Sequence, residues 1–139
     1  MEQAYVQLVE RETFEWNTLV NLLRVEQAAL QLGDISNLAH ISNSKLDLVR
    51  SLDRMAEERE KWQSQHPTQA AAVKSMKTLL ELRETARTLN QQNGTLIDRR
   101  LHAVRKAVDI LLGSARKQNV YDQEGQLTSR HSYQPLSAA

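Results

Sequence analysis

Apolar residues between positions 79 and 112 recur at the spacing of one long amphipathic helix. Nine steps of about 3.56 residues separate the first from the last, between the ~3.5 repeat of a supercoiled helix and the ~3.6 repeat of a straight one. The steps alternate between three and four residues except around Asn93, where three successive steps of four indicate a single phase slip. Asn93 therefore occupies a seam position where leucine is expected, and a polar seam residue costs stability but fixes register or partner. The apolar positions are Leu79, Leu82, Ala86, Leu89, Ile97, Leu101, Val104, Val108 and Leu111.

Two further amphipathic helices precede this one. The first is predicted over about residues 1–32, with Glu12 and Gln27 at polar positions of its repeat. Gly33 supplies a left-handed stop and Asp34 a good N-cap, so the second helix is predicted over 35–65 and returns antiparallel to the first. The apolar face of the first helix carries Tyr5, Leu8, Trp16, Leu19, Leu23 and Leu30.

The second helix has two basic residues, Lys45 and Arg59, at seam positions. We expect both to reach outward along their aliphatic stems. Pro67 suits the first turn of a new helix, so the third helix is predicted over 67–112, with Gly113 ending it. The fold class is therefore all-α, an elongated antiparallel three-helix bundle over 1–113. Because the third helix is the longest, one end of its apolar stripe should stay exposed.

The composition excludes most chemistry and predicts no enzyme. The chain has no cysteine, and its histidines (His40, His66, His102 and His131) share no metal-ligand spacing, so no metal and no cofactor are expected. No phosphate loop, nucleophile elbow or zinc-protease motif is present. Trp16 and Trp62 lie on helix seams and are read as core residues.

Charge is uneven along the chain. Residues 1–69 carry 7 basic and 11 acidic side chains, whereas residues 70–118 carry 10 basic and 4 acidic ones. The basic side chains of the third helix scatter around it, so complementary charge between helices is preferred to a nucleic-acid role. No leader or membrane span is read from the sequence, which predicts a cytoplasmic protein without membrane insertion. Residues 114–139 are predicted to be a flexible C-terminal tail.

Two blocks of the sequence form specific motifs. The first is an Asn-x-x-Asn-Gly-x-Leu-Ile pattern followed by a basic position and a hydrophobic helix. It comprises Asn90, Asn93, Gly94, Leu96 and Ile97, then Arg99, Leu101, Val104 and Leu111. The second is a tyrosine before a short acidic and glycine turn, at Tyr121-Asp122-Gln123-Glu124-Gly125. Together the two blocks resemble the FlgN family of flagellar export chaperones.

The resemblance implies a cytosolic type III export chaperone. Its partners would be the terminal helices of the hook-associated proteins FlgK and FlgL, which it keeps from premature assembly and delivers to the export gate. Tyr121 would dock to the cytosolic domain of that gate, while Tyr133 has no assigned role. The implied substrate-binding residues are Leu89, Asn90, Asn93, Gly94, Leu96, Ile97, Leu101, Val104, Val108 and Leu111.

Two other classes stay open. A generic coiled-coil adaptor or self-associating structural protein would use the exposed stripe as a weak homodimer seam. A nucleic-acid binder would use the basic segment 70–118.

Under the chaperone interpretation, Asn93 and Gly94 would weaken the third helix and let it bend or repack when the guest helix arrives. Exchanging them for leucine and alanine is then expected to stabilise the helix and impair binding.

Overall fold

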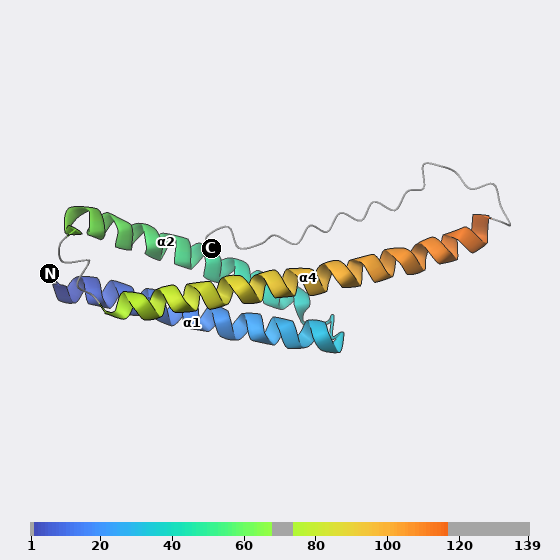
Figure 1. The fold of residues 1–139 in the computed structure, drawn as a ribbon, viewed down its shortest axis with the longest axis horizontal. Coiled ribbons are helices and arrows are strands. Elements are labelled where there is room, and N and C mark those ends of the chain that lie inside the picture. The colour runs from blue at the N-terminus through green and yellow to red at the C-terminus, as the bar shows by residue number, and fades with distance from the viewer. Residues whose placement is uncertain (1, 68–73, 117–139) are drawn as a thin grey trace.

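The computed structural model describes residues 2–67 and 74–116, and three α-helices lie in this part of the chain. Helix α1 is Glu2–Leu32, α2 is Leu38–Gln65 and α4 is Ser75–Arg116. Helix α2 returns antiparallel to α1, and α4 runs parallel to α1 (Figure 1). The fold is the all-α three-helix bundle that the hydrophobic pattern predicts.

Helix α1 is the centre of the bundle. Both α2 and α4 pack along α1, whereas α2 and α4 pack much less against each other. Helix α1 accordingly supplies most of the buried core. The core cluster consists of Tyr5, Val9, Trp16, Leu19, Val20 and Leu23 from α1, Leu52 from α2, and Leu79 and Ala86 from α4.

Two side-chain-to-backbone hydrogen bonds fix the register of α4 on α1. The Nδ2 of Asn93 donates to the carbonyl oxygen of Leu23 at 2.9 Å, across 70 positions of sequence. The Nε of Arg100 donates to the carbonyl oxygen of Leu30 at 2.7 Å, again across 70 positions. The second carbonyl belongs to the last turn of α1, where the carbonyls have no intrahelical donor. A guanidinium at this end also complements the negative pole of the helix.

Two ion pairs are buried between α1 and α2. Glu12 accepts from the Nε of Arg59 at 2.5 Å, and Glu26 accepts from the Nζ of Lys45 at 3.0 Å. All four residues are at most 6% exposed. The expectation that Lys45 and Arg59 reach outward is therefore wrong, because each has an acidic partner at the same level of α1. The sequence predicts Gln27 as the second polar position of the apolar repeat in α1. The polar residue that is buried there is its neighbour Glu26, at 2% exposure.

The two ion-pair levels are two heptads apart on each helix, and the level between them is apolar. Leu19 of α1 and Leu52 of α2 are buried there, at 0% and 2% exposure. A charged layer on either side allows only one alignment of α1 with α2 in which each charge meets its partner. Burial lowers the pKa of the Lys45 ammonium from its ordinary 10.5, and the nearby Glu26 carboxylate opposes that shift.

The turn between α1 and α2 is longer than predicted. Gly33 has a positive φ of 76°, as the predicted left-handed stop requires. The Asp34 carboxylate accepts from the hydroxyl of Ser36 at 2.6 Å and is used inside the turn. Asn37 is the N-cap residue, and α2 begins at Leu38 instead of at residue 35.

Helix α4 starts later and ends later than predicted. It begins at Ser75, whereas the sequence predicts a start at residue 67, and residues 68–73 lie outside the described part of the chain. Gly113 lies inside the helix, since among the described residues only Gly33 has positive φ. The helix ends at Arg116. The rest of the predicted tail, 117–139, lies outside the described residues.

Gly33 in the turn and Gly113 in α4 provide a matched test of their assigned conformations. A Cβ on Gly33 would meet the Arg100 guanidinium at 3.3 Å in a left-handed conformation, whereas one on Gly113 would meet nothing within 4 Å. Gly33→Ala should lower the free energy of unfolding by about 1–2 kcal/mol. Gly113→Ala should raise it by up to about 1 kcal/mol. Urea denaturation measures both, and equal effects would contradict the assignment of Gly33 to a left-handed turn and of Gly113 to a helix.

The Glu26–Lys45 pair should be costly to break and inexpensive to replace. Lys45→Met leaves the Glu26 carboxylate buried without its cation and should lower stability by about 3–5 kcal/mol. The double variant Glu26→Leu/Lys45→Met should fall within about 1 kcal/mol of the wild type, or above it. Urea denaturation of the three proteins measures the difference.

The exposed pair Arg11–Glu58 is the matched control for that experiment. Its atoms are 3.4 Å apart and its side chains are 59% and 58% exposed, so Glu58→Gln should change stability by less than about 0.5 kcal/mol. A Lys45→Met variant as stable as this control would show that Lys45 is not paired inside the bundle.

Candidate partner-binding surface

Helix α4 is too long for its partners to cover. It has 42 residues, against 31 in α1 and 28 in α2. Helix α1 ends at Leu32, which is level with residue 102 of α4 at the fixed offset of 70 positions. Residues 103–116, here called the overhang, project beyond the bundle by about 20 Å, as the orange end of α4 shows (Figure 1).

The overhang presents apolar side chains outside the core. Val104 is 59% exposed, Ile110 is 62% exposed and Leu111 is 71% exposed. Val108 and, at the edge of the bundle, Leu101 are half-buried. The predicted excess of apolar stripe thus lies at one end of the helix, its C-terminal end. Such a stripe is a surface onto which a second amphipathic helix can pack.

The same segment is basic. Between residues 103 and 116 it has Arg105, Lys106 and Arg116 against a single acidic residue, Asp109. A helix that packs on the stripe therefore gains from carrying acidic residues beside its apolar face.

The predicted binding segment begins inside the bundle. Asn93 is 0% exposed and donates to both the Leu23 carbonyl and the Glu26 carboxylate, at 2.9 and 2.8 Å. Asn90 is 3% exposed and its Oδ1 accepts from Lys45 at 3.2 Å. Helix α4 is continuous through both residues. In this conformation Asn90 and Asn93 join the three helices to one another and present no surface to a partner.

The remaining predicted residues divide into an exposed and a half-buried group. Val104 and Leu111 are exposed on the overhang. The others are half-buried: Leu89, Gly94, Leu96, Ile97, Leu101 and Val108. The structure therefore brings two of the ten predicted residues fully to the surface, and both belong to the C-terminal half of the segment.

The side-chain amide of Asn93 is hydrogen-bonded through its nitrogen but not through its oxygen. Its buried Oδ1 has no hydrogen-bond partner among the described residues, while its Nδ2 serves two acceptors. Leucine at this position would remove a donor from the buried Glu26 carboxylate. We therefore expect Asn93→Leu to lower the stability of the bundle by about 1–3 kcal/mol, the opposite of the prediction from the sequence, because a buried carboxylate loses a donor.

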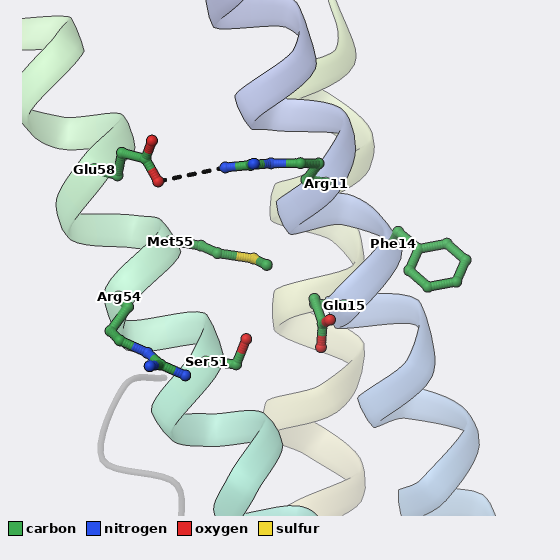
Figure 2. Close-up of a pocket in the computed structure, with 7 residues that line it drawn as sticks. All are labelled: Arg11, Phe14, Glu15, Ser51, Arg54, Met55 and Glu58. Carbon is green, nitrogen blue, oxygen red and sulfur yellow. Dashed lines mark hydrogen bonds and ion pairs between the residues drawn. The ribbon is translucent and has the colours of Figure 1, made fainter.

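A second surface is a groove of about 440 Å³ between α1 and α2. Figure 2 shows Met55 extending from α2 toward α1 and the Arg11–Glu58 pair spanning the groove at 3.4 Å. Phe14, the only phenylalanine of the chain, lines it and is 70% exposed. The charges of this groove come in both signs, since two arginines and two glutamates line it.

Three further predictions concern the tail tyrosines, metal binding and membrane insertion. Tyr121 and Tyr133 lie outside the described residues. Within the described ranges, no three histidine or carboxylate side chains are grouped closely enough to hold a metal ion. None of the helices described is both long and apolar enough to span a membrane.

Comparison with known proteins identifies one family. The family model described as FlgN protein matches residues 1–129. No match to the chain was found among curated proteins or among solved structures. The match includes the whole bundle, the overhang and the position of Tyr121. The chain belongs to the FlgN family, whose members act as chaperones in flagellar assembly.

Proposed function

We propose that this protein is a cytoplasmic type III export chaperone for the hook-associated proteins FlgK and FlgL. In this proposal the overhang binds the amphipathic terminal helices of those proteins, prevents their premature assembly and keeps them competent for export. Family membership supports the general role. The single structural observation that carries the binding step is the apolar stripe of α4 beyond the end of α1.

A helix that packs on the overhang removes apolar surface of both partners from water. Val104 and Leu111 should contribute most to the binding free energy, since burial of such exposed apolar side chains contributes about 1.5–3 kcal/mol each. A client helix that is unfolded before assembly must also be ordered, which costs part of this gain. Binding is therefore reversible, as a protein that must later release its cargo requires.

The position of Asn93 sets a limit on how far the client can extend. Contact with residues 103–116 requires no change in the bundle. Contact with Asn93 requires this residue to leave the Leu23 carbonyl and the Glu26 carboxylate of α1, and contact with Asn90 requires it to leave Lys45 of α2. We place the first contact with the client at the overhang, and the half-buried positions from Leu89 to Leu101 come into use only if α1 moves.

A coiled-coil adaptor or self-associating protein remains the second candidate. The same overhang would then be a homodimer seam. Sedimentation at micromolar concentration separates the two, because a chaperone should be a monomer, or a weak dimer that its client dissociates.

Two changes on the overhang should remove client binding without unfolding the bundle. Val104→Asp/Leu111→Asp introduces charge at two exposed positions, so stability should change by less than about 0.5 kcal/mol. The affinity for a purified hook-associated protein should fall at least about tenfold, since two apolar contacts are lost. Calorimetric titration measures this with the full-length client and with a client lacking its terminal helices.

The exposed Phe14 provides the control for that titration. Phe14→Asp makes the same kind of change on α1, far from the overhang, and should leave the client affinity unchanged. If the overhang variant still binds the full-length client as tightly as the wild type, the client site lies elsewhere. If neither client binds the wild type, the chaperone proposal itself fails.

The assignment of Tyr121 to gate docking has its own test. Tyr121→Ala should preserve the affinity for the hook-associated protein and weaken binding to the purified cytosolic domain of the export gate. Tyr133→Ala is the matched tail variant and should affect neither. Equal loss of both activities in Tyr121→Ala would place Tyr121 in the client site.

A further inference from the structure

A third surface lies between α2 and α4, on a side of α1 that neither helix closes. It is a groove of about 320 Å³ lined by residues of all three helices. The groove exists because α2 and α4 both pack on α1 but much less on each other. In a bundle, such a groove is the place that a fourth helix occupies.

Trp16 of α1 lines this groove and has an unsatisfied polar atom. The residue is 4% exposed, and its Nε1 has no hydrogen-bond partner among the described residues. A buried indole N–H usually finds an acceptor. Trp16 also belongs to the core cluster, so the groove is the side from which a partner can bring an acceptor, once the side chains that cover the buried Nε1 move.

The α2 wall of the groove is acidic. Asp53, Glu57 and Glu60 line it, and none of the three forms an ion pair with a described residue. Arg83 is the only charged residue on the α4 side of the lining. Glu12 and Arg59 also line it but neutralise each other. The unpaired charges therefore sum to a net negative surface that favours a basic ligand.

We propose that the groove over Trp16 is a second docking site, which takes a basic amphipathic helix of a partner protein. The helix places lysine or arginine residues toward Asp53, Glu57 and Glu60. An oxygen acceptor in its apolar stripe, from a glutamine, asparagine, serine or threonine, receives the Trp16 N–H. The volume of about 320 Å³ holds such a side chain together with one neighbouring apolar group.

This site is independent of the client site proposed above. The overhang is basic and selects an acidic or neutral helix, whereas this groove is acidic and selects a basic one. The α1–α2 groove of Figure 2 carries both signs of charge, and its Arg11–Glu58 pair is already formed, so it does not select a basic ligand in the same way.

The chain has two tryptophans, so the indole N–H resonances of the full-length protein report directly on the site. Trp16→Phe identifies the Trp16 signal by its loss. The probe is a synthetic helical peptide of about 20 residues, with a leucine stripe, one central glutamine and flanking lysines. A second peptide carries glutamates in place of the lysines.

The lysine peptide should shift the Trp16 resonance in a saturable way, and the glutamate peptide should leave it unchanged. Glu57→Lys/Glu60→Lys should weaken binding of the lysine peptide at least about tenfold. The matched variant Glu58→Lys, on the other face of α2, should leave binding unchanged, as should Val104→Asp on the overhang. Circular dichroism checks that each variant keeps its helices, which exposed substitutions should not disturb.

Three results would overturn the proposal. The first is no shift with the lysine peptide, and the second is an equal shift with both peptides. The third is a Trp16 shift that appears on raising the protein concentration alone and disappears in Glu57→Lys/Glu60→Lys, which would make a second copy of this chain the occupant. Loss of client binding at the overhang would leave all three measurements interpretable.

Discussion

Glu26 and Lys45 bring opposite charges together at a level of the bundle from which water is excluded. The desolvation of both charges has to be offset by their mutual attraction and by the amides of Asn90 and Asn93, which bind the same groups. The arrangement works in only one alignment of the three helices. That alignment also sets the residue of α4 at which α1 stops supporting it, and therefore how much of α4 remains uncovered.

The central position of α1 explains why the molecule has more than one surface for partners. A three-helix bundle in which each helix contacts both others would bury its apolar faces completely. Here α2 and α4 are joined mainly through α1, so a groove opens between them above Trp16. The excess length of α4 adds the overhang. The overhang lies in the basic part of the sequence and the α2 wall of the groove lies in the acidic part. The fold places these two charged surfaces at different positions on the molecule.

The buried polar residues also separate stability from binding. Asn93 and Arg100 hold α4 on α1 through the backbone carbonyls of Leu23 and Leu30. Asn93 also donates to the Glu26 carboxylate, so only the backbone part of this attachment is independent of the α1 side chains. Beyond Arg100 no such contact with α1 is available, because α1 ends. The transition from a helix held by its neighbours to a helix able to receive a partner therefore occurs within one turn.

The hydrophobic period by itself determined the helix count and the polar seam position at Asn93, because these depend on spacing along one helix. The predicted helix lengths indicated that one end of the third helix stays exposed. Which end this is was decided by the tertiary structure, as was the pairing between helices. Lys45 and Arg59 were predicted to reach outward since one helix cannot reveal an acidic partner on another. A signal existed, because Glu12 and Glu26 are two heptads apart, as are Lys45 and Arg59. Only the packing of the three helices could show that Asn90 and Asn93 face inward, because their partners lie on α1 and α2.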